Sequence, residues 1–116
     1  MKKIYHLSTC DTNQRILKEL KPGKEVVLQD IKTEPITPAQ LDEMKKRAGS
    51  YSALFSKVAR KYRSMGLHER ELTEKEYRKY ILEEYTFLRR PVILVDDQIF
   101  IGNAASVVKA AGAALK

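Results

Sequence analysis

Apolar and polar residues near the N-terminus alternate in a way that predicts a strand, a helix and a second strand. A short apolar run predicts a strand over residues 2–7, which ends in the polar pair Ser8-Thr9. Apolar residues then recur at helical spacing as far as Pro22-Gly23, which predicts a helix over about residues 12–21. The next apolar run predicts a second strand over residues 26–31. This part of the chain therefore predicts a β-α-β unit.

The middle of the chain predicts three helices. Thr37, with proline next and Gln40 three residues on, has the pattern of a capping box and predicts a helix that ends at Gly49. Thr73 with glutamate three residues later predicts another helix, which continues to about Glu84. Between them, apolar residues spaced by three and four predict a helix closed by Gly66 with one buried stripe. That stripe consists of Tyr51, Leu54, Phe55, Val58, Ala59, Tyr62 and Met65.

The C-terminal part predicts a hairpin followed by a helix. Residues 92–95 are all apolar and predict a strand, and Asp96-Asp97 has turn composition. The apolar residues 99–101 predict the return strand. From Ala104 onward, alanine, valine and leucine dominate and predict a terminal helix.

The element order β-α-β-α-α-α-β-β-α is that of a thioredoxin fold with a helical insertion. A β-α-β crossover makes the first two strands parallel, and the hairpin adds an antiparallel pair. We therefore predict the α/β class: a four-stranded mixed sheet in a single thioredoxin-like domain over residues 1–116, with the insert at about residues 37–85. A chain of 116 residues suits one domain.

The short apolar runs and the positive net charge of the chain indicate which kinds of partner the protein can have. The longest apolar runs are far shorter than a membrane span requires, and charged residues interrupt the region where a signal peptide would need its apolar core. We therefore expect no membrane partner and a cytoplasmic location. The net charge is +7, and residues 45–67 contain seven bases and no acid. This basic segment has either the composition of a solvated helix face or that of a contact for an anionic partner.

Cys10 is the only cysteine, so it cannot form an internal disulfide or a thiolate zinc site. It follows the first predicted strand and precedes the first predicted helix. There the unpaired N–H groups and the partial positive charge of the helix N-terminus favour the thiolate, the nucleophilic form. Position 13 holds asparagine, so the chain has no C-x-x-C dithiol, and an oxidised Cys10 needs an external thiol for its reduction.

Three segments resemble the glutaredoxin-linked arsenate reductase family and its Spx-type relatives: residues 10–12, residues 54–67 and residues 87–92. The similarity covers nearly the whole chain. It implies a thioredoxin fold with a helical insert, a cysteine that attacks arsenate, and arginines that hold the oxyanion. Cys10 matches the nucleophile, and Arg90 matches the arginine before a proline, Pro91, that the resemblance implies is cis.

The resemblance and the spacing of residues after Cys10 indicate the remaining site residues. Thr12 matches a hydroxyl residue two places after the nucleophile, and Arg15 lies one helical turn beyond it, where it either adds charge or extends to water. We expect substrate contacts from Thr12, Asn13, Arg15, Arg60 and Pro91.

The chain departs from the family pattern at two positions. Val58 stands where the family has an anion-binding arginine, with Lys57 and Arg60 nearby, and Ile101-Gly102-Asn103 replaces another arginine. Arsenate is a divalent oxyanion that needs several charge-assisted donors, so these replacements argue against arsenate as the substrate.

These observations predict a thiol oxidoreductase that is similar to arsenate reductases and uses Cys10 with Arg90. No cofactor is expected, and the reductant would be a small thiol such as glutathione or a glutaredoxin-like protein, with an oxyanion as a further partner. Two alternatives stay open: an Spx-type regulator that binds RNA polymerase through the basic segment, and a glutaredoxin-like thiol-binding protein without oxyanion chemistry.

Overall fold

The structure, a computed structural model, describes residues 1–116 and divides into two compact units. The first consists of Met1–Pro35 with Arg90–Lys116, and the second of Ile36–Arg89. The second unit matches the predicted insert of residues 37–85 within a few residues at either end. A single thioredoxin-like domain over residues 1–116 stays a prediction.

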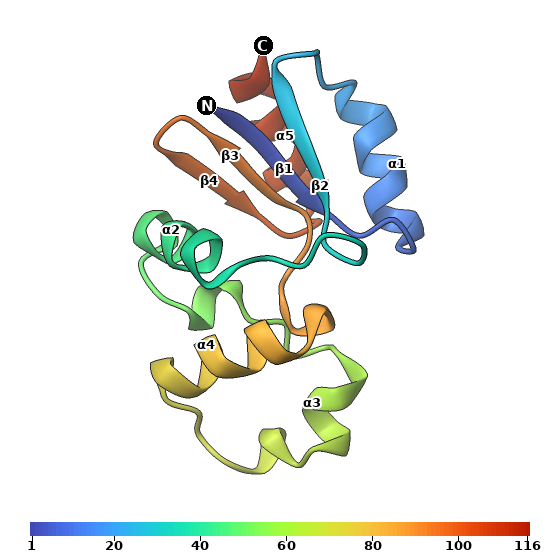
Figure 1. Cartoon of the computed structure of the whole chain (residues 1–116). Helices are drawn as coiled ribbons and strands as arrows, with labels where there is room; N and C mark the ends of the chain where they lie inside the picture. The colour runs from blue at the N-terminus through green and yellow to red at the C-terminus, as the bar shows by residue number, and fades with distance from the viewer. The chain divides into compact units, whose positions relative to one another are not determined.

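The first unit contains a four-stranded mixed sheet in the order β2-β1-β3-β4 (Figure 1). The strands are β1 (Lys2–His6), β2 (Val26–Asp30), β3 (Val92–Val95) and β4 (Gln98–Ile101). Strand β1 pairs parallel with β2 and antiparallel with β3, and β3 pairs antiparallel with β4. Asp96 makes the hairpin turn with a left-handed φ of 53°, a conformation that aspartate tolerates better than most residues. The predicted fold class is confirmed.

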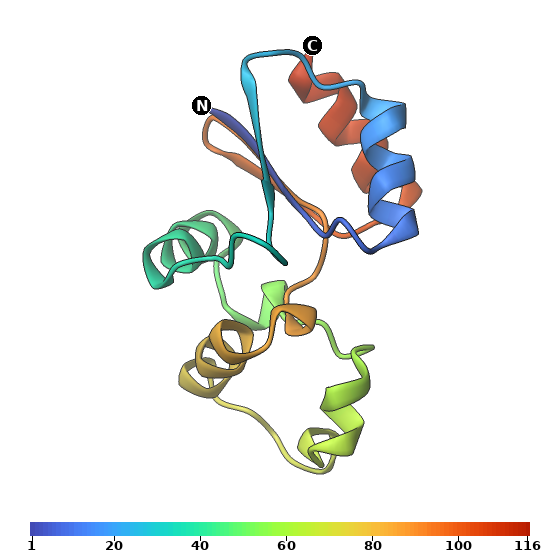
Figure 2. The same ribbon diagram turned by 45° about the vertical axis from the view of Figure 1, so that its right-hand side comes forward.

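Helices α1 (Asp11–Leu20) and α5 (Ala105–Leu115) cover one face of this sheet (Figures 1 and 2). Between these helices and the sheet lies a core of Ile4, Val26, Ile93, Val95 and Ala111, the last of them from α5. Partly buried side chains of both helices, among them Leu17 and Leu115, pack against this core. Helix α1 therefore has a fixed position above the sheet, and its N-terminus lies where β1 ends.

The second unit is helical. It contains α2 (Pro38–Ala48), α3 (Arg60–Ser64) and α4 (Glu74–Glu83), with the 3₁₀ turns η1 (Ser52–Leu54), η2 (Leu67–Glu69) and η3 (Tyr85–Phe87). The two capping boxes predicted from the sequence are both formed, with Thr37 and Gln40 at α2 and with Thr73 and Glu76 at α4. Gly49 ends α2 at a φ of 94°, the left-handed region that favours glycine.

The predicted continuous helix over residues 51–65 is wrong. The chain forms η1, turns extended at Phe55, and resumes as the five-residue α3. Phe55 forms an isolated β-bridge with Leu88, in which the Ser56 N–H donates to the Phe87 carbonyl at 2.7 Å. The predicted stripe residue Val58 is 94% exposed.

Aromatic packing explains why the helix breaks at Phe55. The ring of Phe55 is stacked on Phe87 at 4.9 Å between centroids and lies against Tyr77 at 4.9 Å and Tyr62 at 5.8 Å. Each such pair contributes about 0.5–1.5 kcal/mol beyond its buried area. This cluster and the bridge replace the hydrogen bonds that a continuous helix would make.

A polar network on the second unit links α2, η1 and α4. The Arg78 guanidinium donates to both carboxylate oxygens of Asp42, at 2.8 and 3.2 Å, and the Tyr51 hydroxyl donates to Asp42 at 2.6 Å. Glu74 accepts hydrogen bonds from the N–H groups of Tyr51 and Ser52. The hydrogen bond from Arg78, followed by that from Tyr51, lowers the pKa of Asp42 from 3.8 to about 2.

We expect Asp42→Asn to lower the melting temperature at neutral pH and to have little effect near pH 2. A lowered pKa in the folded state contributes stability above pH 3.8, and this contribution is lost as the pH falls toward about 2. Thermal unfolding of the wild type and of Asp42→Asn, from neutral pH down to about pH 2, measures the difference in melting temperature. Glu71→Gln, at an exposed carboxylate that makes no hydrogen bond or ion pair, is the matched control and should show no such trend. A difference in melting temperature between wild type and Asp42→Asn that is the same at every pH would contradict the lowered pKa of Asp42.

Candidate functional site

The topology of the first unit places two distant segments at one edge of the sheet. Tyr5 near the end of β1 pairs with Val92 at the start of β3, because the two strands are antiparallel. The loop that follows β1 therefore lies at the same edge as the Arg90–Pro91 segment that precedes β3. The loop carries Cys10, and β4 ends at this edge as well, since Ile101 pairs with Val92.

Cys10 is the N-cap residue of α1, with φ −97° and ψ 111°. Its N–H donates to the Leu7 carbonyl at 3.1 Å, and its carbonyl accepts from the Gln14 N–H at 3.1 Å. Its side chain makes no capping hydrogen bond, and the thiol is free and partly exposed. The N–H groups of the first turn of α1 are therefore available to a negative charge on sulfur.

Two side chains of α1 hold the backbone of the Cys10 loop. Asn13 is 1% exposed, and its Oδ1 accepts from the Leu7 N–H at 2.9 Å. Gln14 donates through Nε2 to the Leu7 carbonyl at 3.0 Å. Asn13 was predicted as a substrate contact from its place beside Cys10. The structure gives this buried side chain a structural contact with the end of β1.

A third side chain, Asp30 at the end of β2, holds the other side of the loop. Its Oδ1 accepts from the N–H groups of Ser8 and Lys32, each at 3.1 Å. Hydrogen bonding by Ser8 is the largest cause that lowers the pKa of Asp30 below its ordinary value of 3.8. No local sequence pattern points to Asp30, because only the parallel pairing of β1 and β2 brings it beside Ser8.

Arg90 is half-buried, and Pro91 is buried beside the start of β3. The peptide bond between them is cis, the geometry that the family resemblance implies. The Pro91 carbonyl accepts from the Gly102 N–H at 3.0 Å, and Gly102 has a left-handed φ of 94°. The segment 101–103, where the family has another arginine, therefore contains a buried glycine that contacts Pro91.

The other predicted contacts have different locations. Thr12 is partly buried in the first turn of α1, close in the chain to Cys10. Arg15 is exposed and lines a groove of about 910 Å³ between α1 and α5, which Cys10 does not line. Arg60 is exposed at the start of α3 in the second unit. The structure thus gathers Cys10, Thr12, Asn13 and the Arg90–Pro91 segment at one edge of the sheet, and it places Arg15 in a separate groove.

No group of three or more histidine, cysteine, aspartate or glutamate side chains is arranged to hold a metal ion. None of the helices is long and apolar enough to cross a bilayer.

Comparison with known proteins identifies the family. The model of the ArsC family matches residues 5–111, so the chain belongs to the ArsC family. Comparison with curated protein sequences gives no match.

Solved structures with less than 25% identity show the same thioredoxin-like fold. The YffB protein superposes with a TM-score of 0.80 at 20% identity over 100% of both chains. An arsenate reductase (ArsC) related protein from Brucella melitensis gives 0.73 at 22% identity over 94% of this chain and 92% of its own. An arsenate reductase from Vibrio cholerae gives 0.73 at 18% identity, over 94% of this chain and 95% of its own.

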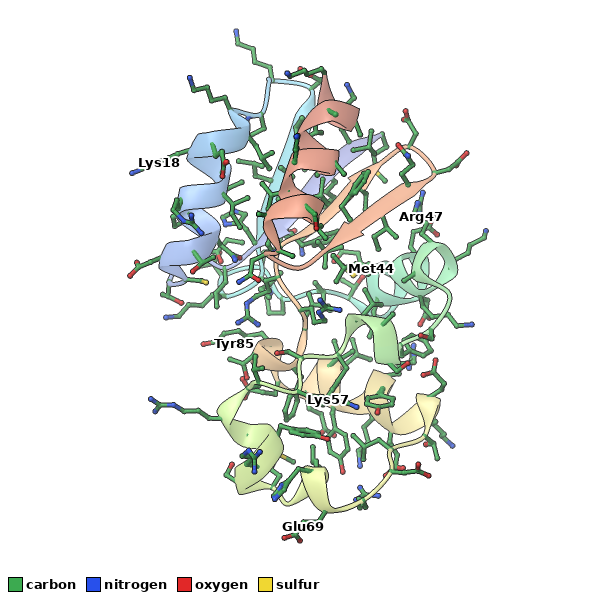
Figure 3. All side chains as sticks on the ribbon, turned by 180° about the vertical axis from the view of Figure 1, so that it is seen from behind. Lys18, Met44, Arg47, Lys57, Glu69 and Tyr85 are labelled. Carbon is green, nitrogen blue, oxygen red and sulfur yellow. The ribbon has the colours of Figure 1, made fainter.

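We expect Asn13→Ala to lower the free energy of unfolding by about 1–3 kcal/mol, because it leaves the buried Leu7 N–H without its acceptor. The freed loop should also slow alkylation of Cys10 by iodoacetamide at pH 7. Urea unfolding and labelling rates measure the two effects. The control is Lys18→Ala, since Lys18 lies on the exposed side of α1 (Figure 3). Wild-type values for Asn13→Ala in both measurements would refute the assigned contact.

Proposed function

We propose that this ArsC-family protein is a thiol oxidoreductase that uses Cys10 as a single nucleophile and an external thiol as its reductant. The placement of Cys10 carries the proposal: a partly exposed thiol at the N-cap of α1, in a loop fixed by Asn13 and Asp30, at the sheet edge that also carries Arg90. The matched family supports the thiol chemistry and a thiol partner. The cytoplasm, where thiols are kept reduced, is the compartment that fits a lone reactive cysteine.

The reaction of a mixed disulfide between a substrate and glutathione balances with one further glutathione thiol. The Cys10 thiolate attacks the glutathione sulfur of a mixed disulfide, so that a new S–S bond forms, the old one breaks, and the substrate leaves as a thiolate that takes up a proton. A second glutathione thiolate then attacks the glutathione sulfur bound to Cys10. This step releases oxidised glutathione and restores the Cys10 thiolate. In total, one mixed disulfide and one glutathione thiol give one substrate thiol and one oxidised glutathione.

Arg90 is proposed to hold negative charge beside Cys10 in this reaction. It is half-buried at the same sheet edge, where its guanidinium favours an anion more strongly than it would in bulk water. Together with the N-terminus of α1, it provides positive charge for one thiolate.

Arsenate is disfavoured as the substrate on the same grounds. Val58 is 94% exposed and apolar at one expected arginine position, and buried Gly102 with its two neighbours occupies the other. A divalent oxyanion that loses several water hydrogen bonds would therefore meet one arginine and one helix terminus.

A second candidate function, an Spx-type regulator, has one observation in its favour. In the basic segment of residues 45–67, Arg47 and Lys61 form ion pairs with Glu43 and Glu84. Lys57, Arg60 and Arg63 are exposed and have no carboxylate partner. Capture of RNA polymerase by the wild-type protein but not by a triple charge-reversal variant at these positions would favour this function.

Cys10→Ser is expected to abolish glutathione-dependent reduction of 2-hydroxyethyl disulfide. Serine is a favourable N-cap residue, so the free energy of unfolding should stay within about 1 kcal/mol of the wild-type value and the melting temperature should change little. The assay follows NADPH consumption with glutathione reductase, and thermal unfolding controls for folding. If Cys10→Ser retains turnover, or the wild type has none above the glutathione background, the proposed chemistry is wrong.

Arsenate should produce no turnover under the same conditions, with glutathione or with an added glutaredoxin as the reductant. The expected cause is weak oxyanion binding and not an unreactive thiol, so the same preparation must reduce 2-hydroxyethyl disulfide. Arsenate turnover that depends on Cys10 would show that the two missing arginines are dispensable.

A further inference from the structure

Strand β2 is an edge strand of the sheet and has an unusually apolar exposed surface. It pairs only with β1 (Figure 1). Val27 is 53% exposed and Leu28 is 47% exposed, and only three other large hydrophobic residues of the chain are exposed to at least this degree. Residues 26–29 contain no charge and no proline, the usual features that prevent an edge from pairing with another chain. The outer edge of β2 is therefore open to a further strand.

The backbone groups that face outward from β2 follow from the strand period. The Ile31 N–H donates to the His6 carbonyl at 2.9 Å, so residues 27, 29 and 31 point their backbone groups toward β1. Val26, Leu28 and Asp30 therefore point theirs outward. The Val26 N–H already donates to Gly23, and the Asp30 carbonyl already accepts from Glu34. The Val26 carbonyl, both groups of Leu28 and the Asp30 N–H are left for an incoming strand.

This set of free groups is complementary to itself. In an antiparallel copy centred on Leu28, the two Leu28 residues exchange both of their hydrogen bonds, and each Asp30 N–H reaches the Val26 carbonyl of the other chain. All of the free groups are then used. Centring the pair on Val27 leaves the Leu28 carbonyl without a donor, because the Val26 N–H is already bonded. Centring it on Gln29 leaves the Leu28 N–H opposite the engaged Asp30 carbonyl.

We propose that β2 pairs antiparallel with β2 of a second copy of this chain, with Leu28 opposite Leu28, to form a continuous eight-stranded sheet. The pairing covers Val27 and Leu28 and supplies four backbone hydrogen bonds. Each copy carries a net charge of +7, which opposes association, so the dimer is a weak one that forms at physiological salt and high protein concentration.

Hydrogen exchange on the wild-type protein tests the register directly. Sedimentation velocity first finds the concentrations at which the chain is monomeric and at which nine tenths of it is dimeric. At the higher concentration, the amides of Leu28 and Asp30 should exchange about tenfold more slowly than at the lower one. These amides exchange only in the monomer, which is then one tenth of the chain. The amides of Val27 and Gln29, bonded to β1 in both states, are the internal control and should not change. A chain that stays monomeric up to about millimolar concentration, or a dimer without protection at Leu28 and Asp30, overturns the proposal.

Cross-linking provides an independent test in a Cys10→Ser background. Leu28→Cys should form an intermolecular disulfide on oxidation with diamide, because Cα atoms of a hydrogen-bonded antiparallel pair lie about 5.5 Å apart, within disulfide range. Val27→Cys is the matched control. In this register Val27 lies opposite Gln29, and the two Val27 residues are diagonal neighbours about 7–8 Å apart, beyond that range. Equal cross-linking of the two variants, or faster cross-linking through Val27→Cys, contradicts the register.

Discussion

Strand β1 determines where the candidate site lies, because it pairs in parallel with one neighbour and antiparallel with the other. Its parallel partner β2 requires a crossover, and α1 supplies it. Its antiparallel partner β3 begins where β1 ends. As a result Cys10, which follows β1, and Arg90, which precedes β3, reach the same edge of the sheet from opposite ends of the sequence. A register shift of one residue in either pairing would reverse the two faces of a strand and expose core residues such as Ile4 and Ile93.

The loop between β1 and α1 is held by side chains because its backbone groups have no strand partner. Asn13 accepts from the Leu7 N–H, Gln14 donates to the Leu7 carbonyl, and Asp30 accepts from the Ser8 N–H. None of these contacts uses Cys10 or the first N–H groups of α1. The polar residues beside the cysteine therefore fix the backbone and leave the thiol and the helix terminus to a substrate.

Local signals in the sequence were sufficient for most elements. The capping residues Thr37 and Thr73, the turn at Asp96 and the stop at Gly49 each act within one helical turn or one hairpin, and the structure has all of them. The helix predicted over residues 51–65 failed for a different reason. Its apolar spacing is helical, but Phe55 packs on Phe87 and bridges to Leu88, which are more than thirty residues away in the chain.

The candidate site shows the same division between local and distant information. Cys10 could be found because a cysteine between a strand and a helix is a pattern of neighbouring residues. Asp30 could not, since its contact with Ser8 depends on strand register. Arg15 was predicted from its spacing along α1, but its side chain lines the groove toward α5, which is set by helix packing.

For the proposed reaction, the charge at the candidate site fits a thiol substrate better than an oxyanion. A thiolate carries one negative charge, and its disulfide partner is neutral at the reacting sulfur, so the reaction needs stabilisation for one charge that passes from Cys10 to the leaving sulfur. In the proposed reaction, the N-terminus of α1, with about half a positive charge, and Arg90 at the same edge of the sheet provide it. A divalent oxyanion brings a second charge and several oxygens, each of which loses water hydrogen bonds on binding. The chain has a valine and a buried glycine segment where further arginines would supply those bonds, which is why the proposed reaction is one that moves the charge of a single sulfur.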